Sequence, residues 1–461
     1  MQNYKLPKIL FLSFFLLVFI FSIFFSNEIL TSLGLLLLFL VILVFIFNPQ
    51  IGLFFLIILR INLDYFRDWE VFTIRDLFSL NFGALFGVFI LIFVFYWIIV
   101  KKTNILKISN SLPIILFLII SLISIFYSGY QFLSLKEWIR IASFFAIYFL
   151  TFDLIKSKKS FPLIQKTFFI SAIIPSLLGF WQILKNTGLR DDAGFLRIYG
   201  SFAHPNAFSY FLIIILTLLV YSFILEQNKK IKKYYLIFII LNIILLLFTY
   251  SRGAWLCLFI ILFLLSFLKY RKKLITSLII LLFLSSSVLF IDNWSQKNYN
   301  YSFLYNFSLT RRIAEITNFN PRTSSFLWRI ELWKDMADVF WQKPIFGHGI
   351  GSFEKEVLKK RGFYAGSYEA HNDYLCIAVE LGIIGLASYL SLILIFLKNI
   401  IKIYKKTTDK NFKLLYLMFF CLSISLFSVN FSENILRNTI IQWCFWVLAG
   451  FIFKSSKLTE K

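Results

Sequence analysis

Residues 371–397, HNDYLCIAVELGIIGLASYLSLILIFL, join a polar segment to a long apolar run. A hydrocarbon core of roughly 30 Å takes about 20 helical residues, which the run at 374–397 supplies. His371 stands just before this run and is one of only three histidines in 461 residues. The stretch therefore predicts a transmembrane helix that begins beside an acid–base group at the membrane rim.

The rest of the chain repeats this apolar pattern. With 59% hydrophobic residues, 60 Phe and 15% charged residues, it is excluded from the class of ordinary soluble domains. Apolar runs occur at 9–25, 29–47, 82–100, 112–127, 137–154, 165–184, 207–225, 233–249, 254–269, 274–291, 374–397, 413–429 and 437–453, with a shorter one at 51–63. We predict an all-α polytopic membrane protein with about 12–14 transmembrane helices, forming a single membrane domain over residues 1–461.

Lysine placement predicts the topology, because short cytoplasmic loops retain positive charge. The basic segments that alternate onto one side are 101–107, 156–166, 229–233, 269–273, 398–413 and 454–461. If Lys5 and Lys8 lie on that side too, the short run at 51–63 must also cross. Both termini are then cytoplasmic, and the first run is a retained helix because no small-residue cleavage site follows it.

The net charge of +24 fits anionic lipid headgroups beside these loops, so we expect a lipid bilayer and no nucleic acid as partner. The four cysteines fall within predicted spans and indicate neither a disulfide framework nor a metal site.

Arginine is concentrated on the predicted outer side, although positive charge is usually enriched in short cytoplasmic loops. On this topology Arg271 is the single cytoplasmic arginine, and the others lie on the outer side or at its rim. A planar guanidinium binds phosphate bidentately, so these residues suit a diphosphate headgroup. The alternative is that they pair with loop carboxylates such as Asp64, Asp191, Asp192 and Asp335 to fold the loops.

One predicted outer loop, residues 292–373, is too long to be a simple connection. Within it, residues 325–342 place Trp328, Leu332, Asp335 or Met336, and Val339 at helical spacing. We predict an amphipathic helix that lies on the bilayer or on the membrane domain and ends at Lys343 and Pro344.

Four elements at the predicted outer rim could bear chemistry. They are Arg197-x-x-Gly-Ser-Phe followed by Asn206, Ser-Arg252-Gly, Arg329-x-x-x-Trp with Pro344-x-x-Gly-x-Gly, and His371-Asn372-x9-Gly-x-x-Gly. In this order they resemble the O-antigen ligase and O-antigen polymerase superfamily of bacterial membrane glycosyltransferases. The resemblance covers residues 160–453 and implies a GT-C-like fold with one large periplasmic loop.

The resemblance implies an inverting, metal-independent glycosyltransferase without a cofactor. It would move a glycan from an undecaprenyl (polyprenyl) diphosphate carrier to a hydroxyl of a lipid A-core-like acceptor, at the outer face of the bacterial cytoplasmic membrane. Carried over by residue, Arg197 and Arg252 would bind the diphosphate and His371 would be the catalytic base. Arg329, Asn206 and Asn372 would support them.

Alternatives remain at this stage. Asp191 or Asp192 could serve as the base, His371 could merely cap the helix that follows, and His204 and His348 are weaker candidates. The same motifs would suit a polysaccharide polymerase or a protein O-oligosaccharyltransferase. A polysaccharide transporter or flippase is more remote, because transporters tend to carry repeats and midplane charges.

Overall fold

The computed structural model describes residues 29–67, 70–74, 78–190, 196–268, 325–362 and 368–458. The predicted runs at 9–25 and 274–291, residues 292–324 of the predicted outer loop, and Asp191 and Asp192 lie outside the described residues.

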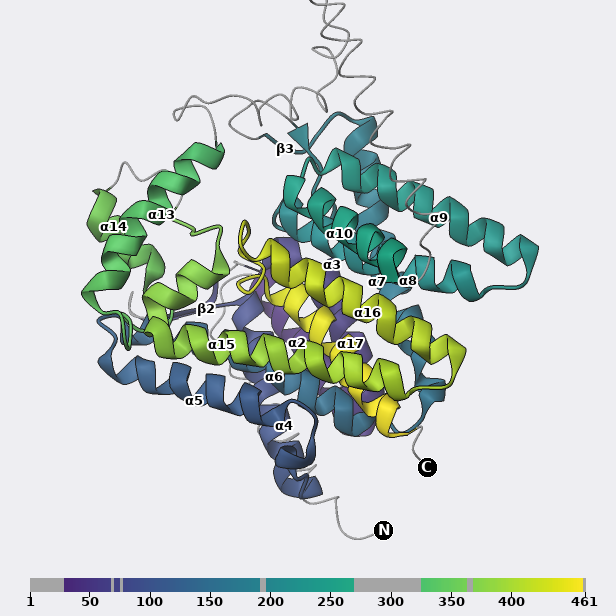
Figure 1. The fold of residues 1–461 in the computed structure, drawn as a ribbon, viewed down its shortest axis with the longest axis horizontal. Helices are drawn as coiled ribbons and strands as arrows, with labels where there is room; N and C mark the ends of the chain where they lie inside the picture. Colours follow the sequence, from purple (N-terminus) through teal and green to yellow (C-terminus); the bar gives the residue numbers. More distant parts are fainter. Residues whose placement is uncertain are drawn as a thin grey trace, which may run out of the picture.

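Helices dominate the described residues, which confirms the all-α polytopic class (Figure 1). The longer helices are α2 (Ile29–Phe47), α3 (Pro49–Asn62), α4 (Phe82–Lys101), α5 (Ser111–Tyr127), α6 (Gln131–Leu154), α7 (Phe161–Leu184), α8 (Pro205–Leu225), α9 (Lys229–Phe248), α10 (Arg252–Leu268), α13 (Ser325–Gln342), α14 (Phe353–Arg361), α15 (Asp373–Lys406), α16 (Lys410–Val429) and α17 (Thr439–Lys457). Short antiparallel pairs join β1 (Glu70–Ile74) to β2 (Phe78–Asn81) and β3 (Leu189–Arg190) to β4 (Leu196–Arg197).

Seven helices of the described residues are long and apolar enough to cross a membrane, and several shorter apolar helices accompany them. The uncertain run at 51–63 forms α3, which turns back on α2 after Asn48, so that Gly52 packs against Phe45. Its 14 residues span about 21 Å. Because this is shorter than a hydrocarbon core, the total number of crossings stays a prediction.

Helices α8 and α17 form the centre of the bundle, where most of their residues are buried, whereas α9 is largely exposed. Aromatic rings fill the space around α17: Phe396 of α15 contacts Phe445 and Trp446, with ring centroids 5.6 and 5.4 Å apart. Edge and tilted ring contacts of this kind add to the stabilisation from apolar burial.

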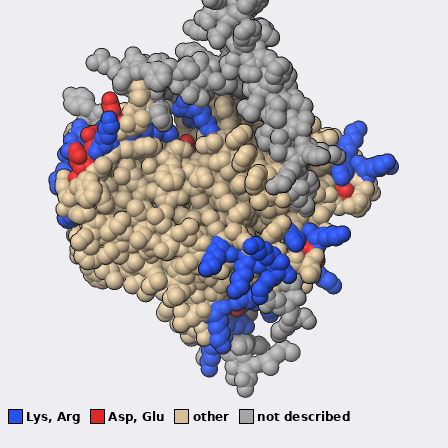
Figure 2. Space-filling model, in the orientation of Figure 1, with Lys and Arg blue, Asp and Glu red and all other residues tan. Residues whose placement is uncertain are grey.

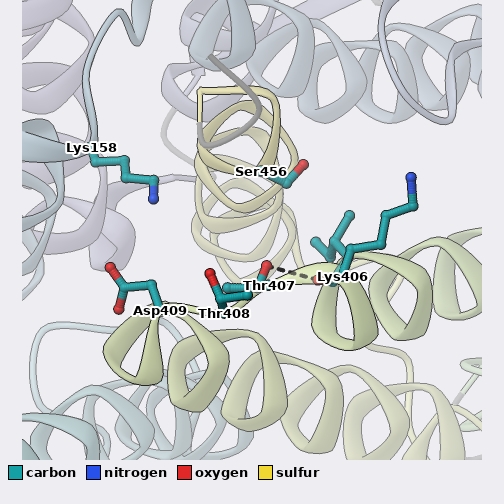
Figure 3. A pocket seen from close by; sticks show the side chains of 7 residues that line it. Lys158, Lys406, Thr407, Thr408, Asp409 and Ser456 are labelled. Atoms are coloured by element: carbon teal, nitrogen blue, oxygen red, sulfur yellow. Dashed lines mark hydrogen bonds between the residues drawn. The ribbon is translucent and has the colours of Figure 1, made fainter.

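The basic segments meet at one end of the bundle. Lys457 donates a hydrogen bond to the carbonyl of Lys107 (2.8 Å). A cavity of about 200 Å³ lies between Lys158, Lys406, Asp409 and Ser456, beside Thr407 and Thr408 (Figure 3).

The surface charges fall into two regions in Figure 2. Lys and Arg lie along the lower part and the right edge of this face, and charges of both signs lie at its upper left. A broad uncharged surface separates the two regions. This arrangement fits the predicted topology, in which one end of the bundle is cytoplasmic.

The predicted amphipathic helix is confirmed as α13. Its Leu332, Met336 and Val339 are buried and pack against α14 and the beginning of α15. The helix therefore covers one end of the membrane helices, at the end of α15 opposite to the cavity (Figure 1).

Helix α15 is broken at Gly382, which has φ +64° and ψ −166°. The segment 344–349 inserts at the break and pairs with the backbone there: Ile383 N–H donates to the Pro344 carbonyl (2.8 Å), and Gly349 N–H donates to the Glu380 carbonyl (2.8 Å). Gly347, with φ +74°, lies so close to Glu380 that a Cβ would come within 2.4 Å of its backbone. Gly347 and Gly382 thus permit this close backbone contact, since a Cβ on Gly382 would lie 2.2 Å from the Ile345 carbonyl oxygen.

Candidate active site

His371 stands immediately before α15, at the end of the bundle predicted to face outward. Its backbone is left-handed, with φ +45°, and Trp333 of α13 fixes the preceding residue by donating to the Ala370 carbonyl (2.8 Å). The helix is capped by Asn372, whose side chain accepts from Leu375 N–H (3.0 Å). The described geometry therefore gives the capping role to Asn372 and leaves the imidazole of His371 for another use.

Glu433 lies opposite His371, in the turn between α16 and α17. Its Oε2 is 3.9 Å from His371 Nδ1, a buried atom that has no hydrogen-bond partner in the part of the chain that the structure describes. The same Oε2 accepts from Asn206 Nδ2 (3.0 Å), and the residue is only 8% exposed. Glu433 was not among the residues predicted from the sequence, where the one signal was its place in the short turn between the last two predicted spans.

Arg197 approaches this carboxylate through Asn206. Strand β4 carries Arg197 opposite Leu189 of β3, and its buried guanidinium donates through Nε to the Thr249 carbonyl (2.9 Å) and through Nη2 to Asn206 Oδ1 (2.5 Å). A continuous set of contacts runs from Arg197 through Asn206 to Glu433 and His371. The structure thus brings together residues that are far apart in the sequence.

The Ser-Arg-Gly turn reaches the same place. Arg252 is the first residue of α10 and is half-buried. A Cβ on the next residue, Gly253, would lie 2.3 Å from the Tyr210 hydroxyl and 3.2 Å from Glu433 Oε1. Only glycine allows this turn to approach Glu433, which places the backbone of Arg252 beside the carboxylate.

Arg329 joins the cluster from α13. Its Nη1 donates to the carbonyl of Ser432 (2.9 Å), next to Glu433. Two electrostatic effects follow: the positive charge of Arg329 lowers the pKa of His371, and it also lowers the pKa of Glu433, against the effect of burial. Arg329 is therefore a direct neighbour of the acid–base pair.

Burial sets the protonation states of this pair. Desolvation, with a further contribution from Arg329, lowers the pKa of His371 to about 3, so that its imidazole is neutral at pH 7. Desolvation raises the pKa of Glu433, and the charges of Arg329 and Arg197 oppose that rise. An unprotonated imidazole can accept a proton, and a carboxylate beside it can stabilise the imidazolium that forms.

The other two histidines have structural partners. His204 caps α8 by accepting from Asn206 N–H at Nδ1 (3.1 Å), and burial and Arg197 lower its pKa to about 4. His348 contacts the Val339 carbonyl through Nε2 (3.0 Å) within the part of the chain that covers α15. Their geometry agrees with their rank as weaker candidates for the base.

Several rim arginines pair with carboxylates, as expected if these arginines serve to fold the loops. Arg60 contacts Asp64 (3.1 Å) and Arg361 contacts Asp335 (2.5 Å). Arg437 binds both Glu354 (2.5 Å) and Glu380 (2.9 Å). The Arg60 and Arg361 pairs are contacts of the kind that the loop-folding interpretation predicts, whereas Glu354 and Glu380 lie in α14 and α15. No group of three His, Cys, Asp or Glu side chains that could hold a metal ion occurs within the described ranges.

Comparison with known families identifies this region. Residues 236–390 match a family described as O-Antigen ligase. The resemblance to the O-antigen ligase superfamily is confirmed. The comparison with curated proteins finds no match.

The O-antigen ligase match and the geometric site overlap without being identical. The matched residues contain Arg252, Arg329 and His371, whereas Arg197 and Glu433 lie before and after them. The site around His371 is therefore assembled from residues inside the matched range 236–390 and from elements on both sides of it.

Proposed function

We propose that the protein is a glycosyltransferase of the O-antigen ligase type. It transfers a glycan from a polyprenyl diphosphate carrier to a hydroxyl of a lipid acceptor, at the outer face of the bacterial cytoplasmic membrane. One observation supports this most strongly: the unpartnered, buried Nδ1 of His371 faces Glu433 inside a cluster that includes Arg197 and Arg329.

In the proposed reaction His371 is the general base. If Nδ1 carries its proton toward Glu433, the lone pair on Nε2 is left for the acceptor hydroxyl. The acceptor oxygen forms a bond to the anomeric carbon while the bond from that carbon to the diphosphate oxygen breaks. The hydroxyl proton passes to Nε2, and the electron pair of the broken bond leaves with the diphosphate. A single displacement of this kind inverts the anomeric configuration.

Glu433 acts as a positioning residue in this proposal. A small movement would close the distance of 3.9 Å to His371 Nδ1 into a hydrogen bond. The carboxylate would then fix the tautomer and stabilise the imidazolium that forms when His371 takes the proton. Because Asn206 links Glu433 to Arg197, binding of the donor diphosphate at Arg197 would also change the position of Glu433 beside His371.

The arginines supply the charge that the leaving group needs. Arg197 is oriented by Thr249 and Asn206, and Arg252 lies at the first turn of α10, where the positive end of the helix dipole adds to its charge. Cationic groups fixed before the reaction stabilise the developing diphosphate more effectively than solvent does. Ligase, polymerase and protein O-oligosaccharyltransferase activities share this chemistry and differ in the acceptor.

Reconstitution would test the proposal. Purified protein in phospholipid vesicles would receive a polyprenyl-diphosphate glycan, with or without a lipid-core acceptor and with or without a chelator. We expect glycan on the added acceptor, unaffected by the chelator. A ladder of longer carrier-linked glycans without the acceptor would indicate a polymerase, and carrier-linked glycan that only changes leaflet would indicate transport.

A further inference from the structure

The last turn of α13 and the loop that follows it expose large apolar side chains. Trp341, Ile345 and Phe346 are 72%, 54% and 60% exposed, and Lys343 between them is also exposed. We call these four residues the turn patch. Single exposed apolar residues are ordinary, but a cluster containing Trp and Phe on a connecting segment usually marks an interaction site.

The turn patch is held firmly against the membrane helices. Tyr127, the last residue of α5, donates a hydrogen bond to the Phe346 carbonyl (2.6 Å), and the two rings meet edge to face with centroids 6.4 Å apart. On the other side, Ile383 N–H donates to the Pro344 carbonyl (2.8 Å) at the break in α15. These contacts fix the backbone at residues 344–346 and the ring of Phe346 against α5 and α15.

The patch continues an apolar surface that belongs to predicted spans. Phe126 and Ile123 of α5 are 78% and 54% exposed, and Ile383 of α15 is 51% exposed. In a membrane-crossing bundle these residues face lipid. Because Tyr127 and Ile383 contact the turn directly, the turn patch lies at the edge of the same lipid-facing surface.

Helix length places the membrane boundary at this level. Residues 383–397, between the break and the first lysine of the predicted basic segment, span about 22 Å, and the lysines that follow can extend their charged ends to the headgroups, so that the outer boundary falls near the break. The ionic pair of Glu380 with Arg437 then lies at the boundary, not within the hydrocarbon. Trp beside Lys is typical of the interfacial zone, where the indole sits at headgroup level and Lys extends toward phosphate.

We propose that the turn patch is a lipid anchor: Ile345 and Phe346 insert into the bilayer leaflet on the predicted outer side, with Trp341 and Lys343 at headgroup level. The occupant is phospholipid, because the surface is continuous with the lipid-facing sides of α5 and α15. The anchor would hold α13, and through Trp333 the backbone before His371, at a fixed height above the membrane. This inference is independent of the proposed reaction.

Site-directed spin labelling would test the anchor. Phe346→Cys and Ile345→Cys would be labelled in full-length protein in nanodiscs of phosphatidylcholine and phosphatidylglycerol, with one copy in each disc and no polyprenyl lipid. Phe126→Cys serves as the lipid-facing reference, and Lys359→Cys, exposed on α14, as the water-facing one. The unsubstituted chain, whose four cysteines are buried, gives the labelling background.

We expect positions 345 and 346 to resemble position 126, with collisions with a water-soluble nickel chelate several-fold fewer than at 359 and more frequent collisions with oxygen. Nickel accessibility equal to that at 359 would overturn the proposal. Protection that appears only when two copies share a disc, or only after polyprenyl lipid is added, would overturn it in favour of a second copy or of the donor's tail.

Discussion

Two charged clusters lie along the first turns of α15, and they differ in how completely their groups are paired. Around Glu380, Arg437 contacts Glu380, Glu354 and the sulfur of Cys376, while Arg140 donates to Glu137 and to the Arg437 carbonyl. Around His371, nine residues earlier, Nδ1 has no hydrogen-bond partner among the described residues, and Glu433 Oε2 is 3.9 Å away.

The contrast distinguishes a structural site from a reactive one. Buried polar groups in folded proteins are normally satisfied, so each exception calls for an explanation. The Glu380 cluster is closed in the sense that each of its carboxylates contacts an arginine, although Nε of Arg140 lacks a hydrogen-bond partner among the described residues, and Arg437 joins the covering helices to the start of α17. The His371 cluster is held together by Asn206 and Arg197 but leaves the imidazole open. Substitution should therefore affect stability in the first cluster and turnover in the second.

The largest effect should come from His371→Ala. Without the base we expect transfer to fall by about a thousand-fold or more, in the range by which general acid–base groups accelerate reactions, while the melting temperature in detergent changes little. His204→Asn, which retains a capping acceptor for α8, is the matched control and should stay active. Near-normal turnover by His371→Ala would refute the base assignment.

Arg437→Met tests the closed cluster. Removing one partner of a buried ion pair typically costs about 3–5 kcal/mol, because the remaining charge is left unpaired. We expect a clearly lower melting temperature and transfer activity that falls only in proportion to the folded fraction. Adding Glu380→Gln should restore part of the stability. Unchanged melting with lost turnover would place Arg437 in the reactive site instead.

Arg252→Lys should weaken donor binding about ten-fold although the charge is retained, because an ammonium cannot reproduce bidentate contact with a diphosphate. Titration with the lipid-linked diphosphate measures this directly. Arg190→Lys, on the exposed strand β3, provides the comparison. Equal affinity of Arg252→Lys and the unsubstituted protein would exclude a bidentate role for Arg252.

The smallest effect concerns pH. Because burial lowers the pKa of His371 to about 3, the folded protein keeps the base unprotonated as the pH falls below 6.5. Activity should therefore persist through pH 6.5, where an exposed histidine would be half protonated. Glu433, whose pKa is raised, is then the group whose protonation lowers activity at acid pH. Glu433→Gln should remove this acid-side fall in the pH–activity profile and lower the maximal activity about ten-fold. A midpoint at pH 6.5 that persists in Glu433→Gln would argue for an accessible imidazole.

Hydropathy and periodicity predicted most of the described helices well. The run at 29–47 coincides with α2, and residues 325–342 with α13, because apolar length and 3.6-residue spacing are local properties of the chain. The break at Gly382 was not predicted. It depends on the insertion of 344–349, a tertiary contact between segments that the sequence keeps apart.

The candidate site was predicted in part for the same reason. Arg197, Arg329 and His371 stand out as unusual residues at the rim, and they do converge. Glu433 does not stand out, because an acidic residue in a short turn usually faces solvent. Its burial arises from Asn206 and from the close approach of Gly253, which only the folded structure reveals.

The hydrogen bonds at Gly382 also limit how related proteins can exchange parts. Since the carbonyls of Pro344 and Ile345 serve the broken turn of α15, and Val379 and Glu380 serve the 348–349 backbone in return, neither segment has complete backbone pairing alone. A chimaera that replaces the covering helices α13 and α14 should therefore take residues 325–384 as one unit. Junctions placed between residues 349 and 380 would take the 344–349 segment from one protein and the broken turn of α15 from the other, so that their backbone hydrogen bonds would not match.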